Sequence, residues 1–397
     1  MKIAFISYEF PPETGYGGIG TYTYQISKAL SAKGHHVEVF SSSPDKEVLD
    51  VEIENSVILH RVKADKRSIF SERIVEIFQK RNAIIGFDLI ESPEYCAEGM
   101  AVRKAFNEIP MVVKLHAPLF LIKDLNNVYK KKSIKAVIKK YAGLNKYDKT
   151  KDHDYVFASC ANAVCSPSQA LAMVVKEKWN IRNVDIVPNV FVPSAPYLSL
   201  PVESSFDRIC FVGKLNVLKG MKALTKAIPL VLQKHPVAKF RFIGKDGESP
   251  DGSGSMKEYI TKALDKYTLN LEFTGYVPHN KIPHFLSDCD MVVLPSLWEN
   301  YPYTCLEAMS AGKAVVGSYS GGMKEILQQG KGGFLINPEK PREIAHAISW
   351  LLSHPEKRIE MGYYNRKQTE QHAELTLNDA EEYYFKLISA TKKKPVA

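Results

Sequence analysis

The feature that most constrains the fold is a repeated alternation of short apolar runs with helical patterns. In the first half, strands are predicted at 2–7, 37–40, 57–62, 83–90, 112–115, 163–166 and 185–187, with an amphipathic helix at 21–32. The alternation restarts with predicted strands at 208–212, 239–243, 271–273, 291–295 and 314–317. Strands separated by helices form parallel βαβ units with helices on both faces. The sequence therefore predicts an α/β protein built from two Rossmann-like αβα domains.

A stretch rich in proline and serine separates the two alternations. Residues 193–201 show no periodicity, which is typical of an interdomain linker. At 397 residues the chain also exceeds the size at which one hydrophobic core usually keeps growing. We expect an N-terminal domain at 1–190, a linker at 191–205, a C-terminal domain at 206–370, and a final helix with a basic tail at 371–397. That helix is expected to pack back on the N-terminal domain.

Composition and charge narrow the class of protein. No run approaches eighteen apolar residues, so no membrane-spanning helix is predicted, and we expect a cytoplasmic protein. The six cysteines show neither C-x-x-C pairs nor zinc-ligand spacing. The net charge of +9 favours anionic partners such as nucleotide phosphates, acidic lipids or nucleic acid. Nucleic acid is not expected, because no recognised binding motif accompanies the lysines.

Two carboxylates lie at a predicted strand-to-helix crossing in the second half. A strand ends at Pro295, Glu299 follows in a loop, and a helix begins near Thr304 with Glu307 in its first turn. Ligands of open parallel sheets collect at such crossings, and a helix N-terminus offers N–H donors to a phosphate. Carboxylates can also accept hydrogen bonds from sugar hydroxyls. An alternative stays open, since Thr304 and Glu307 have the spacing of a capping box.

A pair of cations follows the predicted strand at 208–212. Lys214 and Lys219 lie five residues apart, between Gly213 and Gly220. Two positive charges can stabilise the charge that develops on a departing diphosphate, and glycine permits close approach of the backbone. The alternative interpretation is two solvated lysines on a loop.

Together these motifs resemble the retaining GT-B glycosyltransferases of the family with a Glu, seven residues, Glu motif (glycosyl transferases group 1, family four). The resemblance rests on Glu299, Glu307, Ala308, Met309, Gly312 and the segment 315–325 with its Gly321–Gly322 pair. It implies a GT-B fold with a cleft between the domains, an acceptor-side N-terminal domain and a nucleotide-sugar-binding C-terminal domain. It also implies that Glu299 contacts the donor sugar and Glu307 the ribose. The family usually has Arg then Lys where this chain has Lys214 and Lys219. The planar guanidinium, which can bind a phosphate through two N–H groups, is therefore replaced by the single ammonium of Lys214.

The same resemblance assigns the other candidate residues. The family has a His near the reacting sugar, matched by His116 after the run 112–115, and a glycine pair facing the donor, matched by Gly17 and Gly18. We expect the catalytic residues to be His116, Lys214, Lys219 and Glu299. The donor-binding residues are expected to be Gly17, Gly18, Gly213, Tyr276, Asn300, Tyr301, Tyr303, Thr304 and Glu307.

Neither a metal ion nor a cofactor is expected, and the nucleotide sugar is a substrate. Asp288-Cys-Asp290 lies where a strand begins, whereas sites in parallel sheets form where strands end. Asp152-His-Asp154 lies in a polar stretch. In the resembling family the leaving phosphate oxygen is thought to take the acceptor proton, so the reaction needs no metal.

A basic segment at 123–151 holds ten lysines and two aspartates. Ile134, Val137, Ile138 and Tyr141 recur there at helical spacing, which suits an amphipathic helix on an anionic membrane surface. A solvated helix packed by its apolar stripe is the alternative.

The sequence thus predicts a retaining, metal-independent glycosyltransferase. UDP-sugar is the first choice of donor and GDP-sugar the second, with a glycan, glycolipid or lipid-linked acceptor. Peripheral attachment to the inner face of the membrane is part of this expectation. The alternatives are a nucleotide-sugar-binding regulatory partner without activity and a GT-B-type epimerase.

Overall fold

Two sheets organise the chain, one in each of two units. The computed structural model describes residues 1–15, 17–45, 48–53, 57–129 and 147–392. Unit 1 takes its residues from 1–123, 143–192 and 373–397, and unit 2 from 124–142 and 193–372. Each unit is an α/β structure and is considered by itself below.

The sheet of unit 1 has the strand order β3-β4-β2-β1-β5-β6-β7-β8, and all pairs are parallel except β3 with β4. The strands are β1 (Lys2–Ile6), β2 (His36–Ser43), β3 (Val48–Ile53), β4 (Val57–Lys63), β5 (Leu89–Pro93), β6 (Met111–Lys114), β7 (Ala163–Ser166) and β8 (Asp185–Ile186). Because β2 and β5 flank β1, the order of strands reverses direction between β1 and β5.

The helical segments of the first half connect these strands. They are α1 (Gly18–Ala32), α2 (Arg67–Ile85), η1 (Tyr95–Ala97), α3 (Met100–Ala105), α4 (Leu119–Tyr129), η2 (Lys149–Lys151), α6 (His153–Cys160) and α7 (Gln169–Trp179). The predicted strand at 83–90 was wrong in its first part, because α2 continues to Ile85 and ends at Gly86, which has φ 64°. The predictions also missed β3.

The sheet of unit 2 is wholly parallel, with the order β11-β10-β9-β12-β13-β14. Its strands are β9 (Arg208–Val212), β10 (Lys239–Ile243), β11 (Leu271–Gly275), β12 (Met291–Leu294), β13 (Ala314–Ser318) and β14 (Gly333–Ile336), the last of which was not predicted. The helical segments are α8 (Ala195–Leu198), α9 (Met221–Leu232), α10 (Met256–Ala263), η3 (Asp265–Asn270), η4 (His279–Lys281), α11 (Ile282–Leu286), α12 (Tyr303–Ser310), α13 (Met323–Ile326), α14 (Pro341–Ser353) and α15 (Pro355–Lys392).

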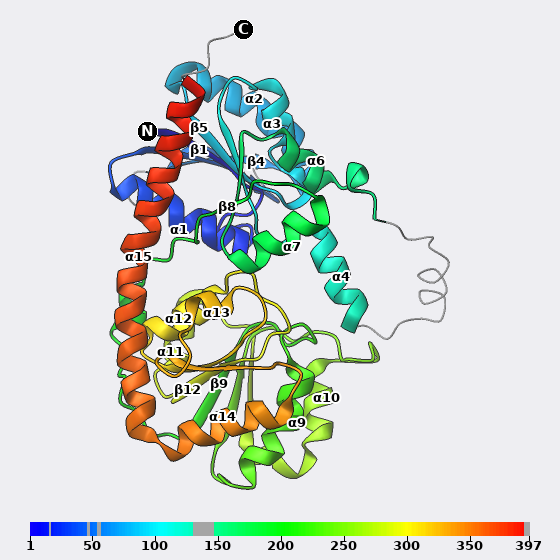
Figure 1. Cartoon of the computed structure of the whole chain (residues 1–397), viewed down its shortest axis with the longest axis vertical. Coiled ribbons are helices and arrows are strands. Elements are labelled where there is room, and N and C mark those ends of the chain that lie inside the picture. The colour runs from blue at the N-terminus through cyan, green and yellow to red at the C-terminus, as the bar shows by residue number, and fades with distance from the viewer. Residues whose placement is uncertain (16, 46–47, 54–56, 130–146, 393–397) are drawn as a thin grey trace. The chain divides into compact units, whose positions relative to one another are not determined.

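Helices cover both faces of this second sheet, as Figure 1 shows for α9 and α14 on one face and α11 and α12 on the other. Successive residues of a strand point to opposite faces. Accordingly Ile209 and Phe211 of β9 pack in the core with α9 and α14, whereas Cys210 and Val212 pack with α11 and α12. β9, β12 and β13 are therefore buried on both faces, which explains why they are largely apolar runs in the sequence.

The last helix, α15, contributes to both units. In unit 2, Arg366 donates to the carbonyl oxygens of Leu200 and Ser310. In unit 1, the Tyr384 hydroxyl donates to the buried Glu91 carboxylate at 2.5 Å, and Lys33 pairs with Glu381 at 2.7 Å.

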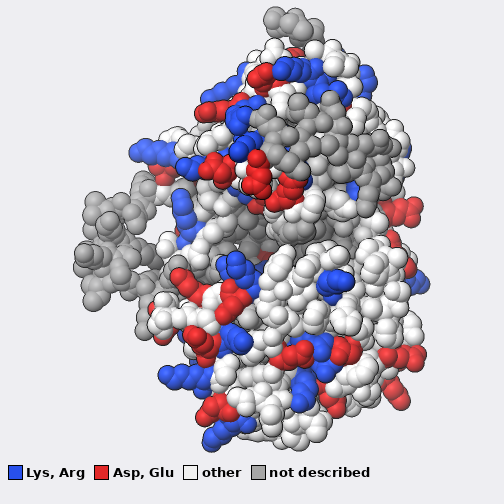
Figure 2. All heavy atoms as spheres, turned by 180° about the vertical axis from the view of Figure 1, so that it is seen from behind, with Lys and Arg blue, Asp and Glu red and all other residues white. Residues whose placement is uncertain are grey.

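None of the described helices is long and apolar enough to cross a membrane. The segment predicted as a basic amphipathic helix falls largely on 130–146, outside the described residues. On the face drawn in Figure 2, the basic and acidic side chains of the described residues are interspersed.

Candidate active site

Two loops meet at the carboxyl ends of β9 and β12, where the strand order of unit 2 reverses direction. The Leu297 N–H donates to the Leu218 carbonyl oxygen at 2.8 Å. Gly220 has φ 77°, and a Cβ on it would lie 1.8 Å from the Pro295 carbonyl oxygen. Only glycine permits this approach, so the two loops are fixed to each other. A parallel sheet binds ligands at such a switch point.

This contact between loops brings together two of the predicted catalytic residues. The Lys219 ammonium lies 2.5 Å from Oε1 of Glu299, and the Ser296 hydroxyl donates to the same oxygen at 2.7 Å. The Lys219 N–H in turn donates to Oδ1 of Asn216 at 2.9 Å. The ion pair is partly exposed, with 32% of the Lys219 side chain and 15% of the Glu299 side chain accessible. A cation and a carboxylate are thus placed where a ligand can reach both.

The Gly321–Gly322 pair holds the main chain of Glu299 from the side of β13. Glu299 and Gly321 form a parallel bridge, and the Gly322 N–H donates to the Glu299 carbonyl oxygen at 2.7 Å. The loops after β9, β12 and β13 therefore all converge on this glutamate.

Glu307 does not cap its helix. α12 begins at Tyr303, its N-cap is Pro302, and no side chain caps it. Oε1 of Glu307 instead lies 2.7 Å from Nε2 of His279, in η4. The hydrogen bond with Glu307 raises the pKa of His279. The capping-box alternative is therefore wrong, and the carboxylate is paired with a neighbouring segment.

The other predicted residues of unit 2 lie around these loops with different surroundings. Gly213 continues the backbone pairing by donating to the Ile243 carbonyl oxygen at 2.9 Å. Lys214 is exposed, and no ion pair to it is found within the described ranges. Tyr276 is 62% exposed. The structure thus brings Lys219, but not Lys214, into contact with Glu299.

The residues after Glu299 are mostly occupied by protein contacts. Asn300 accepts a hydrogen bond from the Trp298 indole at 2.6 Å. The Tyr301 hydroxyl lies 2.6 Å from Nε2 of His372, and Tyr303 is buried. Thr304 is half-buried in α12.

In unit 1, His116 lies at the carboxyl end of β6 beside a buried glutamate. Both oxygens of Glu94 accept from the His116 N–H, at 2.9 and 2.8 Å, and one also accepts from the Ala117 N–H at 2.7 Å. Burial, with the Lys114 ammonium, lowers the pKa of His116 to about 3, so the imidazole is neutral at pH 7. Its ring meets that of Tyr22 edge-on, with centroids 5.0 Å apart.

A second buried carboxylate supports the same region. Asp154 accepts from the Leu119 N–H at 2.7 Å and from the Cys96 N–H at 2.9 Å. Cys96 and Ala97 have φ of 57° and 53°, a strained conformation for residues other than glycine. Burial raises the pKa of Asp154 to about 6 and, with the Coulomb effect of Asp154, that of Glu94 to about 8.

The predicted glycine pair lies where α1 begins. Gly17 is the N-cap residue and Gly18 the first residue of the helix. A Cβ on Gly17 would lie 3.0 Å from Oε2 of Glu9, whereas one on Gly18 would meet nothing. Glu9 itself pairs with Arg67, which also pairs with Glu98.

The two Asp-x-Asp strings have structural partners. Asp288 pairs with Arg241 at 2.5 Å and also with Arg208, and Asp290 accepts from the Arg208 N–H at 2.9 Å. Asp152 is the N-cap of α6. In the described part of the chain no group of three or more His, Cys, Asp or Glu side chains could hold a metal ion.

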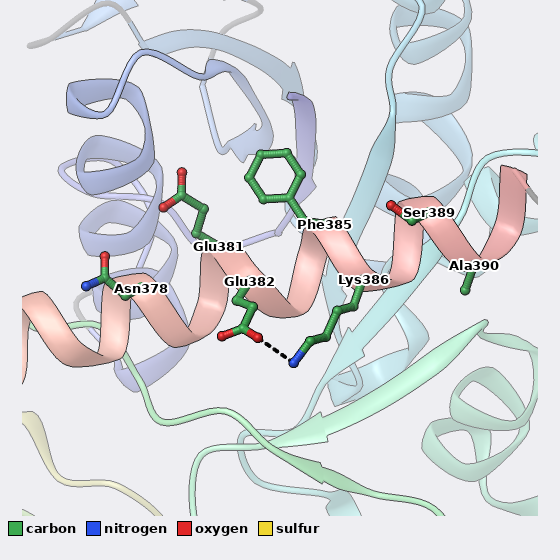
Figure 3. A pocket seen from close by; sticks show the side chains of 7 residues that line it. All are labelled: Asn378, Glu381, Glu382, Phe385, Lys386, Ser389 and Ala390. Atoms are coloured by element: carbon green, nitrogen blue, oxygen red, sulfur yellow. Dashed lines mark ion pairs between the residues drawn. The ribbon is translucent and has the colours of Figure 1, made fainter.

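A pocket of about 790 Å³ lies along the unit 1 end of α15. None of the predicted site residues lines it. Figure 3 shows its lining, which comes from α15 alone: Asn378, Glu381, Glu382, Phe385, Lys386, Ser389 and Ala390. Because it contains none of the predicted residues, it is not a candidate for the donor site.

Sequence reasoning missed three groups that contact the predicted residues, namely Ser296, His279 and Glu94. Ser296 directly follows a strand end and could have been found from that position. Glu94 directly follows β5, but the strand predicted there ended at residue 90, and its partner His116 is 22 residues away. The contact of His279 with Glu307 joins residues 28 apart, which no local pattern indicates.

Comparison with known proteins agrees with this arrangement. Residues 200–368 match the profile of Glycosyl transferases group 1, and residues 16–193 match that of Glycosyltransferase Family 4. The chain is 27% identical over 367 residues to an uncharacterised glycosyltransferase of Methanocaldococcus jannaschii, with 89% of each chain covered. It is 22% identical over 372 residues to a glycogen synthase of Mycobacterium tuberculosis, covering 89% of this chain and 87% of that one.

Solved structures share the fold. Sucrose-phosphate synthase from Thermosynechococcus elongatus superposes with a TM-score of 0.74 at 21% identity, covering 98% of this chain and 100% of that one. Anabaena HepE in complex with UDP gives a TM-score of 0.68 at 18% identity, covering 97% and 100%. The fold is that of a GT-B glycosyltransferase, as predicted. The two matched glycosyltransferase profiles lie one on each half of the chain and together cover most of it.

Proposed function

We propose that the protein is a retaining glycosyltransferase that moves a hexosyl group from a nucleoside-diphosphate sugar to a glycan, glycolipid or lipid-linked acceptor. The observation that carries the proposal is the cluster of Lys219, Glu299 and Ser296 at the switch point of unit 2. An ammonium beside a carboxylate suits a ligand that has a diphosphate next to a sugar. UDP is the first nucleotide to test and GDP the second, and the Anabaena structure in complex with UDP supports that order.

Each side chain has a part in this reaction. The bond between the anomeric carbon and the diphosphate oxygen breaks, the acceptor oxygen bonds to the same face, and its proton passes to the leaving phosphate oxygen. Lys219, with Lys214, stabilises the charge that grows on the diphosphate. Glu299 accepts from hydroxyls of the donor sugar and Glu307 from those of the ribose. To His116, whose imidazole is neutral at pH 7, the proposal assigns a hydrogen bond to the donor sugar that adds no charge. No metal ion takes part.

The test combines turnover with nucleotide binding. Purified protein should hydrolyse a UDP-sugar slowly and transfer it faster when an acceptor is present. Glu307→Ala should weaken binding of free UDP by about 1–3 kcal/mol, because a charge-assisted hydrogen bond is lost. Glu299→Gln should leave UDP affinity within about twofold and lower turnover, because its contact is with the sugar. Calorimetry and a coupled assay measure both.

Three results would contradict the proposal. Failure to bind UDP, GDP and ADP would remove its basis. Binding without any turnover would favour the regulatory partner, and an isomeric nucleotide sugar as product would favour the epimerase.

The basic segment at 123–151 adds a second part to the proposal, attachment to an anionic membrane surface. Near such a surface each lysine contributes about 1 kcal/mol, so about four of the ten suffice for reversible adhesion. Flotation with acidic liposomes should depend on low salt and fall when Lys130, Lys131 and Lys132 become Glu. Protein that stays unbound at low salt would indicate a soluble acceptor.

A further inference from the structure

The carboxylate of Glu307 has a side-chain partner that lies outside the sequence motif. Nε2 of His279 lies 2.7 Å from Oε1 of Glu307. His279 begins η4, just after β11, whereas Glu307 lies within α12, so the contact joins two separate segments. Glu307 is 5% exposed and His279 is 44% exposed. A surface histidine thus holds a carboxylate that is otherwise enclosed.

The two oxygens of this carboxylate have different surroundings. His279 occupies Oε1, and among the described residues no hydrogen bond to Oε2 is found. Tyr197 packs against His279 from α8, with ring centroids 6.4 Å apart. The buried Tyr197 hydroxyl has no hydrogen-bond partner among those residues, and burial together with the Glu307 charge raises its pKa. One carboxylate oxygen and one hydroxyl are therefore left without protein partners in the same small region.

We propose that His279 is a positioning residue for nucleotide binding, which holds Oε1 of Glu307 so that Oε2 accepts hydrogen bonds from the vicinal hydroxyls of a ribose. This inference rests on the proposed function, which assigns ribose binding to Glu307. A carboxylate that turns freely must lose rotational freedom when it binds a diol, and one already held does not. The histidine also supplies a donor to an oxygen whose burial would otherwise be costly.

A hydroxyl-dependent binding experiment tests the proposal. Affinities for UDP and for 2′,3′-dideoxy-UDP are measured by calorimetry on the full chain and on three variants. His279→Leu should weaken UDP binding about three- to tenfold, the effect of one lost hydrogen bond. His279→Gln keeps an N–H donor and should restore affinity to within about twofold. His284→Leu, at an exposed histidine of α11, is the matched control and should bind as the parent does.

The dideoxy nucleotide separates positioning from a general loss of structure. It lacks the hydroxyls, so it should bind the parent weakly and should not discriminate between the parent and His279→Leu. Equal UDP affinity of the parent and His279→Leu would overturn the inference while leaving the proposed function intact. A His279→Leu loss that is the same for both nucleotides would also overturn it, since the effect would not pass through the ribose. Absence of binding by UDP, GDP and ADP would overturn the proposed function, and this inference with it.

Discussion

Gly321 packs against the main chain of Glu299 so closely that a Cβ on it would lie 2.0 Å from the Glu299 carbonyl oxygen. Its φ of 76° is also in the left-handed region that favours glycine. The second-domain glycine pair of the sequence motif therefore has a physical role, which is to let the loop after β13 fix the loop that carries the glutamate.

Gly321→Ala should accordingly impair both folding and turnover. The left-handed φ alone costs about 1–2 kcal/mol for alanine, and the clash adds to it by displacing Glu299. Gly330→Ala is the matched control, because Gly330 has φ 75° and open space around its Cα. Urea unfolding should show the larger loss for Gly321→Ala, and only that variant should lose transfer activity. Equal losses in the two variants would mean that the contact with Glu299 is unimportant.

The two lysines should differ in their effect on turnover. Lys219 contacts Glu299, whereas Lys214 is exposed, so Lys219→Ala should lower turnover about a hundredfold and Lys214→Ala less. Both should weaken UDP more than UMP, because the lost charge faces the diphosphate. Lys214→Arg should keep activity or raise it, because a planar guanidinium can donate two hydrogen bonds to the diphosphate. The same loss for UMP as for UDP would contradict a role at the diphosphate.

Periodicity predicted most of this fold, and its failures have local causes. The central strands β9 and β12 of unit 2 are buried on both faces, so they stand out as the apolar runs 208–212 and 291–294. The strand predicted at 83–90 began too early, because the apolar residues that end α2 are followed closely by those of β5 and only Gly86 marks the boundary. β3 was missed because the predictions followed continuous apolar runs, whereas β3 alternates in polarity over residues 50–53, the pattern of a half-exposed strand.

The candidate site was predictable where residues follow strand ends and not where they meet across segments. Glu299 and Lys219 each follow a strand of the switch point, so the parallel order of β9 and β12 brings them together. The contact of His279 with Glu307 depends on how η4 packs beside α12, which no local pattern encodes. The predicted cleft between the domains stays a prediction.

Removal of divalent metal should leave transfer unchanged. The proposal assigns the ammonium groups of Lys219 and Lys214 to the diphosphate, and neither needs a metal ion to act. Activity in excess chelator should stay near its untreated rate. A loss of more than about tenfold that Mn²⁺ or Mg²⁺ restores would show that a metal ion supplies part of the charge.

The stability of the protein should fall as pH rises toward 8, and Glu94 should account for much of that fall. Its pKa is about 8 in the folded protein, against an ordinary 4.5, because the carboxyl is buried and Asp154 is close. The folded state therefore holds a proton that the unfolded chain releases between these values, so the contribution of Glu94 to the free energy of unfolding is largest below pH 4.5 and falls up to pH 8. The slope is at most about 1.4 kcal/mol per pH unit.

The pH dependence of the free energy of unfolding is best compared between the parent and a Glu94 variant from pH 6.5 to 8. Asp154, with a pKa raised to about 6, acts in the same direction but only below that window. Glu94→Gln removes the titrating group, so its free energy of unfolding should change less from pH 6.5 to 8 than that of the parent. The variant should also be less stable overall, because an amide nitrogen replaces an oxygen that accepts from the N–H groups of His116 or Ala117. Slopes from urea unfolding are therefore the measure, with the exposed Glu72→Gln as control. A slope in Glu94→Gln equal to that of the parent would show that Glu94 does not carry a proton in this range.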